Sequence, residues 1–269
     1  GSSEACMLGG VAAWLRWRAK RKAAGKPCDK PNLVMSAAYQ VVWEKFCQLW
    51  QIELRTVPLD EKHPTLDVDA ALKICDENTI CIVPIAGVTW TGLNDDVEAL
   101  DKALDDYNRK TGYDIPIHVD AASGGFILPF LNPGKKWDFR LRWVQSISTS
   151  GHKFGLVYPG LGWVVWRDKK YLPGEMSFSV NYLGASITQV GLNFSRPAAQ
   201  ILGQYYNFIR LGFEGYREIQ QNSMDIAAYC HRATGEMTCF RVFARELVNP
   251  LFLWSLLPSY DKHAKRTLL

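Results

Sequence analysis

The stretch Thr79-Ile80-Cys81-Ile82-Val83-Pro84-Ile85 is an almost unbroken apolar run, and it is the clearest sign of how the chain folds. Side chains along a strand point alternately to the two faces of a sheet, so a fully apolar run indicates a strand covered on both faces. Further strands are expected at residues 32–35, 53–59, 115–120, 144–148 and 162–167. Stretches with helical periodicity separate most of them, at residues 40–50, 67–75 and 95–110. This alternation predicts an α/β fold with a mostly parallel sheet and helices on both faces.

The pattern changes at about Pro197. Two long helices are expected at residues 198–211 and 216–232, and two strand-like runs follow at 239–243 and 251–257. We therefore predict a large domain at residues 1–196, and a helical connection with the start of a smaller C-terminal domain at residues 197–269. The chain has no initiator methionine and stops in apolar residues without a capping signal, so both ends look cut. We expect a fragment in which both domains are truncated.

Composition narrows the class of protein. A chain of 269 residues with 48% hydrophobic and 22% charged residues is typical of a globular protein, and no apolar run approaches the roughly 18 residues of a spanning helix. The net charge of +4 is mild, and its basic cluster at residues 16–26 falls on a predicted helix, so we expect a solvated helix face and no nucleic-acid or membrane binding. The seven cysteines are odd in number and form no CxxC pair, which indicates buried thiols in a reducing compartment, the cytoplasm.

Side chains that could bind a ligand or catalyse a reaction follow the ends of several predicted strands. Thr89, Asp120 and the segment from Ser150 to Lys153 all do so, and in a parallel sheet ligands bind outside the carboxyl ends of the strands. The Lys153 amine can form a Schiff base with a phosphorylated aldehyde, and the hydroxyls before it can bind the phosphate. An ordinary exposed lysine is the alternative interpretation.

Asp120 closes a buried strand and has two interpretations. It can be a helix cap or half of a salt bridge. It can also lie beside the ring nitrogen of a pyridine cofactor and keep that nitrogen protonated, while the small Ala121 and Ala122 let the ring lie close to the backbone. Ser2 and Ser3 begin a predicted helix, where they can cap it or, together with its free backbone N–H groups, bind an anion.

Three segments carry a specific resemblance: His118–Phe126, Ser148–Gly155 and Asn193–Pro197. They resemble pyridoxal-phosphate-dependent glutamate decarboxylases of the plant, fungal and bacterial type, within the group II decarboxylase family. The likeness also includes Gly1–Ala5 and Gly87–Gly92 and fades after about Ala228. It implies a fold-type I large domain with a sheet of the seven-stranded type, and decarboxylation of L-glutamate to 4-aminobutanoate (GABA) and CO₂. The implied cofactor is pyridoxal 5′-phosphate, and no metal is expected.

The resemblance also implies roles for individual residues. By this likeness Lys153 forms the Schiff base, Asp120 pairs with the pyridinium nitrogen and Ala122 packs against the ring. Four residues are implied on the phosphate side, with His152 also counted among the catalytic residues: Ser2, Ser3, Ser150 and His152.

The remaining implied residues concern the substrate and a neighbouring subunit. Gln40 takes the place over the ring where relatives acting on aromatic amino acids carry a stacking histidine, which favours glutamate. Thr89 lies next to the cofactor and the substrate carboxylate. Ser195 reaches the phosphate of a neighbouring subunit, so a homodimer or higher homo-oligomer with its site at the interface is expected.

Alternatives stay open at this point. The enzyme can be another fold-type I decarboxylase, a lyase or an aminotransferase, or the chain can be an inactive fragment that binds only cofactor or partner subunits. In the family the residues that bind the distal carboxylate lie upstream of Gly1, so we expect this chain by itself to be inactive. His118 and Asp120 also form an H-x-D pair that could bind a metal.

Overall fold

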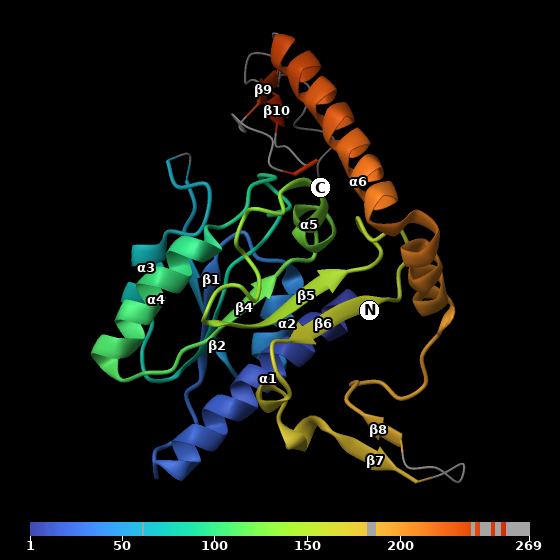
Figure 1. Cartoon of the computed structure of the whole chain (residues 1–269). Coiled ribbons are helices and arrows are strands. Elements are labelled where there is room, and N and C mark those ends of the chain that lie inside the picture. Colours follow the sequence, from blue (N-terminus) through green and yellow to red (C-terminus); the bar gives the residue numbers. More distant parts are fainter. Residues whose placement is uncertain (61, 182–186, 238–239, 243–248, 251–253, 257–269) are drawn as a thin grey trace, which may run out of the picture.

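The computed structural model describes residues 1–60, 62–181, 187–237, 240–242, 249–250 and 254–256, and its centre is one twisted sheet (Figure 1). The strands of this sheet are β1 (Asn32–Ser36), β2 (Glu53–Val57), β3 (Thr79–Val83), β4 (Ile117–Asp120), β5 (Val144–Ser150) and β6 (Gly162–Trp166). Their order is β2-β1-β3-β4-β5-β6, with the first five parallel and β6 antiparallel to β5.

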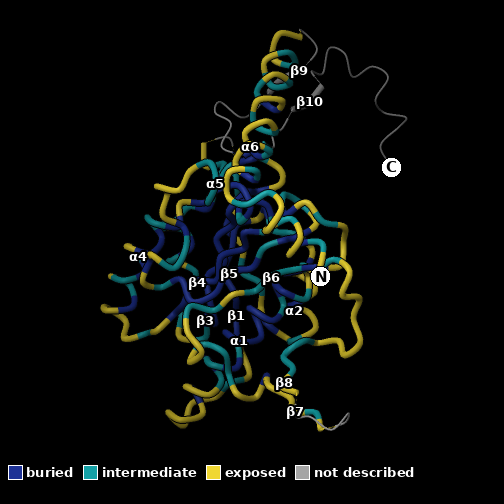
Figure 2. The backbone as a smooth tube through the Cα atoms, turned by 45° about the vertical axis from the view of Figure 1, so that its right-hand side comes forward, coloured by how far each residue is buried: buried dark blue, intermediate teal, exposed yellow. Residues whose placement is uncertain are grey.

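Helices cover both faces of the sheet and bury a core on each side (Figure 2). α1 (Ser2–Ala23) and α2 (Val41–Leu49) cover one face, and α3 (Val68–Lys73) and α4 (Val97–Thr111) cover the other. The apolar strands supply both cores because alternate residues point to opposite sides: in β1, Leu33 belongs to the first core and Val34 to the second. The predicted α/β fold, mostly parallel with helices on both faces, is confirmed.

Four short helices and two pairs of short strands also belong to the described chain. The short helices are η1 (Gly124–Phe126), α5 (Leu128–Leu131), η2 (Lys169–Tyr171) and η3 (Gly174–Met176). β7 (Phe178–Val180) and β8 (Ile187–Gln189) form an antiparallel hairpin that the sequence pattern did not predict. β9 (Phe240–Val242) pairs with β10 (Trp254–Leu256) within the two predicted strand-like runs, whose positions 239, 243, 251–253 and 257 lie outside the described residues.

The predicted break between the two long helices is at Gly212. α6 (Ala199–Glu236) has φ 61° and ψ −165° at this residue, a conformation that side-chain-bearing residues rarely adopt. Gly215, also expected in the break, lies within the helix. No helix in the described part of the chain combines the length and apolarity needed to cross a membrane. The division into domains at residues 196 and 197 stays a prediction.

The position of α1 depends on two close contacts of glycine. A Cβ atom on Gly9 would lie 2.3 Å from Cε1 of His118, and one on Gly162 would lie 2.5 Å from Cα of Ser2. Both distances are far shorter than real Cβ contacts, so α1 can lie this close to β4 and β6 only because these residues lack side chains. The N-terminus of α1 is thereby held at the edge of the sheet where β5 ends.

Two sequence-based expectations need correction. Neither Ser2 nor Ser3 caps α1, because Gly1 occupies the N-cap position and Ser2 already belongs to the helix. The six cysteines in the described part are free thiols as expected, but Cys28 and Cys230 are only half-buried.

Candidate active site

The chain order reverses between β1 and β3, and two predicted site residues meet at this point. The chain passes from β1 to β2 on one side and then returns to β3 on the other. Gln40 follows β1, Thr89 follows β3, and Nε2 of Gln40 donates a hydrogen bond to Oγ1 of Thr89 over 2.9 Å. Ligands of open α/β sheets bind at such a reversal, outside the carboxyl ends of the strands. The structure therefore places Gln40 and Thr89 where a ligand is expected.

Asp120 ends β4 with a carboxylate that is 2% exposed. Nε1 of Trp43 donates to its Oδ2 over 2.7 Å, and the backbone N–H of Ala122 donates to its Oδ1 over 3.1 Å. Burial raises the pKa of Asp120, while these two hydrogen bonds and the charge of Lys153 act to lower it. The carboxylate is thus held by a donor on each oxygen.

Lys153 lies in the loop after β5, at the same edge of the sheet as Asp120. Its Nζ donates to Oγ of the buried Ser123 over 3.4 Å. The backbone N–H of Ser150 donates to the carbonyl of the half-buried Ala122 over 3.2 Å, which joins the ends of β4 and β5. An amine and a buried carboxylate thus lie within electrostatic reach of each other.

The predicted phosphate side is built around the first turn of α1. Oγ of Ser2 lies 3.1 Å from Nδ1 of His152, and Ser3 is exposed in the same turn. Partial burial and the charge of Lys153 lower the pKa of His152. Oγ of Ser150 is buried and has no hydrogen-bond partner among the described residues. The first backbone N–H groups of a helix lack intrahelical acceptors, so this corner offers several unused donors to an anion.

Ser195 lies apart from this group, on a loop that α1 holds in place. Oε1 of Glu4 accepts hydrogen bonds from the backbone N–H of Leu192 over 2.9 Å and from Nη1 of Arg196 over 3.2 Å. Ser195 itself is exposed, and in the described part of the chain no hydrogen bond joins it to the other predicted site residues. Its role toward a neighbouring subunit stays a prediction.

The residues grouped at this edge of the sheet, Ser150, Lys153 and Asp120, suit pyridoxal phosphate. An unpaired buried hydroxyl at Ser150, beside the free first turn of α1, is what a phosphate would satisfy. Lys153 offers the amine for the aldehyde, and Asp120 offers a buried anion for the ring nitrogen.

Sequence analysis missed three residues that support the site. Trp43 matches the apolar pattern of α2 and cannot be told from an ordinary core residue. Glu4 lies in the segment Gly1–Ala5 that carries the resemblance, but its contact with the backbone of Leu192 needs the tertiary structure. Ser123 belongs to a quoted motif, but its bond to Lys153 needs the tertiary structure.

His118 is engaged in hydrogen bonds that leave its ring nitrogens occupied. Nδ1 lies 2.7 Å from Oγ of Ser146, and Nε2 lies 3.1 Å from Oγ of Ser148. The H-x-D pair with Asp120 is therefore used for internal hydrogen bonds, which disfavours the metal interpretation. Burial lowers the pKa of His118 to about 3, so the ring is neutral at ordinary pH.

This buried neutral ring predicts a pH dependence of stability. Between pH 6.5, the ordinary pKa of histidine, and the folded value of about 3, the unfolded chain binds a proton that the folded chain does not. Stability should therefore fall as pH falls through this window, by about 1.4 kcal/mol per pH unit at most. Urea unfolding of the full-length apoprotein should show that the free energy of unfolding falls less between pH 7 and pH 5 for His118→Gln than for wild type.

The control is His63→Gln, at an exposed histidine of the described chain. This variant should respond to pH like wild type. Equal responses of wild type and His118→Gln would contradict a buried neutral His118.

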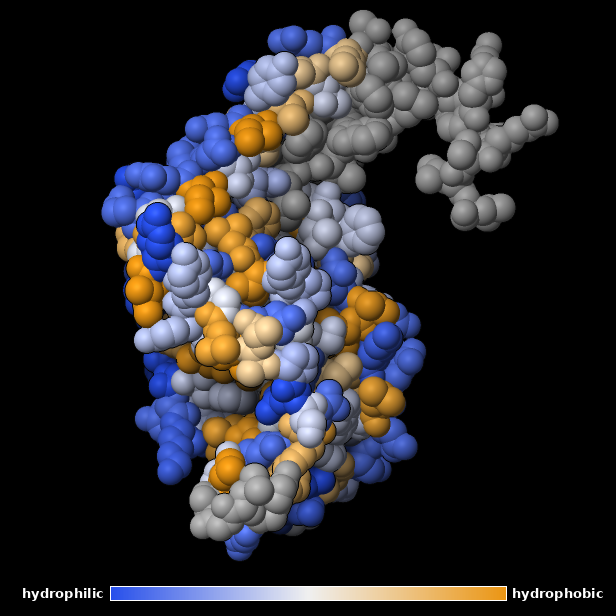
Figure 3. All heavy atoms as spheres, turned by 90° about the vertical axis from the view of Figure 1, so that its right-hand side faces the viewer, coloured by the Kyte–Doolittle hydropathy of each residue, from blue (hydrophilic) through white to orange (hydrophobic). Residues whose placement is uncertain are grey.

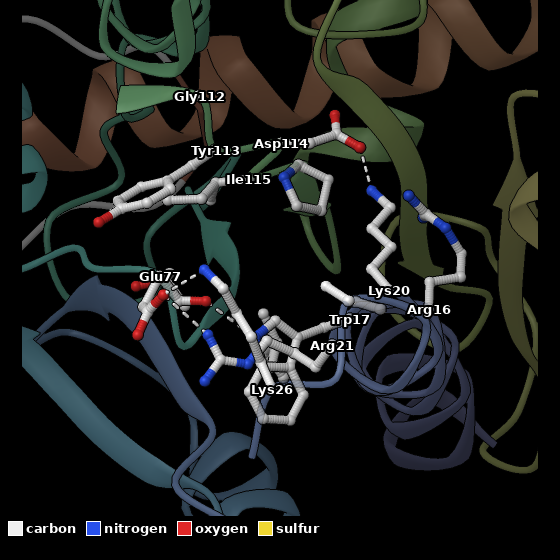
Figure 4. Close-up of a pocket in the computed structure, with 15 residues that line it drawn as sticks. Arg16, Trp17, Lys20, Arg21, Lys26, Glu77, Gly112, Tyr113, Asp114 and Ile115 are labelled. Atoms are coloured by element: carbon white, nitrogen blue, oxygen red, sulfur yellow. Dashed lines mark hydrogen bonds and ion pairs between the residues drawn. The ribbon is translucent and has the colours of Figure 1, made fainter. Parts of the chain in front are cut away.

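A separate hollow of about 240 Å³ lies at the opposite, amino-terminal edge of the sheet (Figure 4). Lys20 pairs with Asp114, and Arg21 and Lys26 both pair with Glu77. The predicted basic helix face is thus largely ion-paired, and its member Arg21 is buried instead of solvated. The hollow is therefore lined by ion pairs, and it lies at the edge of the sheet opposite to Asp120 and Lys153.

Comparison with known proteins gives consistent matches. Residues 1–255 match the family model described as the pyridoxal-dependent decarboxylase conserved domain. Glutamate decarboxylase beta of Listeria monocytogenes is 54% identical over 245 residues, which cover 90% of this chain and 53% of that protein. Glutamate decarboxylase of Lactococcus lactis subsp. cremoris is 53% identical over 258 residues, which cover 95% of this chain and 55% of that protein. The chain thus spans little more than half the length of these curated relatives.

The solved structure of glutamate decarboxylase from Lactobacillus brevis has a similar fold. It superimposes with a TM-score of 0.92 at 50% identity, covering 98% of this chain and 60% of that one. The fold-type I architecture that the resemblance implied is thus confirmed, and six strands of its sheet lie in the described residues.

Proposed function

Since the chain belongs to the family of pyridoxal-dependent decarboxylases, we propose that the longer protein converts L-glutamate into 4-aminobutanoate and CO₂. The observation that carries the reaction class is the meeting of Asp120, a buried carboxylate, with the Lys153 amine at one edge of the sheet. The relatives named above support glutamate as the substrate. The cofactor of the family is pyridoxal 5′-phosphate.

We assign binding of the cofactor to residues in the first turn of α1 and to residues at and after the carboxyl ends of β4 and β5. The Lys153 amine would hold the aldehyde, and Ser2, Ser3, Ser150 and His152 would hold the phosphate together with the N–H groups of α1. Ala122 would offer a small surface to the ring. These assignments are supported by the unpaired hydroxyl of Ser150 and by the contact between Ser2 and His152.

Catalysis needs the ring to accept electrons and the substrate to be oriented. Bound pyridoxal phosphate supplies a conjugated ring that stabilises the charge left on Cα when CO₂ departs. The Asp120 carboxylate would hold a proton on the ring nitrogen, which strengthens that effect. Gln40 would lie over the ring, and Thr89 would help to fix the orientation of the α-carboxylate, which decides which bond to Cα breaks. Their mutual hydrogen bond supports a joint role.

The test is a substrate panel on the full-length protein loaded with pyridoxal phosphate. CO₂ release and amine formation would be measured with L-glutamate, L-aspartate, L-tyrosine and L-tryptophan. We expect kcat/KM for L-glutamate to exceed that for L-tyrosine and L-tryptophan by at least about 100-fold, because a site for a distal carboxylate rejects side chains that lack it. It should exceed that for L-aspartate, whose side chain is one methylene shorter, by about 10-fold or more. A higher kcat/KM for another amino acid would overturn the substrate assignment, and amine exchange without CO₂ release would overturn the reaction class.

Assembly as a homo-oligomer is part of the same proposal. Large apolar side chains are exposed along the first half of α6 (Figure 3): Ile201, Leu202, Tyr205, Tyr206, Ile209 and Phe213. An apolar face of this extent is typical of a surface covered by another chain. We assign it to a second copy of this protein, with Ser195 of each subunit reaching the phosphate site of its partner.

Free thiols at the described cysteines support a cytoplasmic location.

A further inference from the structure

Trp43 is a fully buried side chain whose indole points at the candidate active site. It is 0% exposed, and its Nε1 donates to Oδ2 of Asp120 over 2.7 Å. Its ring meets His118 edge-on at 5.3 Å and Phe46 at 6.1 Å between ring centroids. These neighbours hold the indole in place, so its hydrogen bond to Asp120 is preorganised.

A proton shared by Asp120 and a pyridine nitrogen has two positions. It can lie on the nitrogen, which gives an ion pair, or on the carboxylate, which gives a neutral pair with the same atoms and the same total charge. Burial favours the neutral pair, because charges lose solvation in the protein interior. An indole N–H can only donate a hydrogen bond, so it favours the charged carboxylate over the protonated acid. The backbone N–H of Ala122 acts on Oδ1 in the same direction.

We propose that Trp43 is a positioning residue whose indole N–H keeps Asp120 an oriented carboxylate and thereby keeps the shared proton on the pyridine nitrogen of the cofactor. This inference rests on the proposed function, since it requires bound pyridoxal phosphate. It differs from a purely structural role, in which Trp43 would fill space between α2, α1 and the sheet and would not affect the protonation of the ring.

The experiment reads the proton directly. The full-length holoenzyme is loaded with cofactor labelled with ¹⁵N in the ring, and solid-state NMR measures the chemical shift of this nitrogen. Wild type should show a protonated nitrogen, and Trp43→Phe should show a shift towards the unprotonated value. In the same variant kcat for glutamate should fall about 10- to 100-fold, the usual range for a lost hydrogen bond to a charged group. KM should change by less than about threefold, because the lost interaction acts on the transition state.

Two further proteins separate this effect from a loss of packing. Trp17→Phe is the matched control, because Trp17 is also buried and its indole N–H donates to the Glu77 carbonyl at 3.1 Å, away from Asp120. It should leave the ring nitrogen protonated. Replacement of Trp43 by 3-benzothienylalanine keeps the shape but puts sulfur in place of N–H, and it should reproduce the shift even if Trp43→Phe does not fold.

An unchanged ring nitrogen in the benzothienylalanine protein would overturn the proposal and leave Trp43 a core residue. Failure of the proposed function has a different signature, namely a wild-type protein that binds the cofactor but does not decarboxylate glutamate. In that case the NMR comparison still decides the role of Trp43.

Discussion

Replacing Lys153 by alanine in the full-length protein is expected to lower kcat for glutamate by roughly 10⁴-fold or more, the range seen when the group forming a covalent intermediate is removed. The Lys153 amine lies in the loop after β5, at the edge of the sheet where Asp120 ends β4, and it donates a hydrogen bond to Ser123. From this position it would form the covalent link to the cofactor, so its removal should abolish most of the activity. Reduction of wild-type holoenzyme with borohydride, followed by peptide mass mapping, should place the phosphopyridoxyl mass on Lys153.

Lys102→Ala provides the control for this experiment. Lys102 is a lysine on α4 with a 75% exposed side chain near Glu98, and its removal should leave kcat unchanged. Phosphopyridoxyl label on any lysine other than Lys153 would refute the assignment, as would a Lys153→Ala variant that keeps most of its activity.

Asp120→Asn should impair chemistry far more than cofactor binding. The amide has nearly the size of the carboxylate but no charge, so it cannot hold a proton on the ring nitrogen. We expect a loss of about 3–5 kcal/mol of transition-state stabilisation, several orders of magnitude in kcat at about 1.4 kcal/mol per decade. The affinity for pyridoxal phosphate should change much less, since Lys153 and the phosphate side are intact. Steady-state kinetics and cofactor titration measure the two effects separately.

A second buried aspartate shows whether the loss is specific to the site. Asp101 on α4 accepts hydrogen bonds from the backbone N–H groups of Arg142 and Trp143. Asp101→Asn should lower the stability of the protein without a large change in kcat. An Asp120→Asn variant within tenfold of wild type would show that Asp120 does not control the ring nitrogen.

The sequence by itself determined the α/β fold and most of the candidate site. Apolar runs such as residues 79–85 identify buried strands locally, because their side chains alternate between two covered faces. Once the strands are parallel, residues that follow their carboxyl ends share one edge, so Asp120 and Lys153 could be grouped before any coordinates were known. The family resemblance then assigned roles to the grouped residues.

Only the tertiary structure decided which polar atoms meet. Ser2 contacts His152 across 150 positions of the chain instead of capping its own helix, and Trp43 donates to Asp120 across 77. The physical reason is that periodicity shows which face of a helix or strand is buried, but not which group faces a given atom across the core. That choice depends on how closely α1 and α2 approach the sheet, which Gly9 permits where α1 packs on His118.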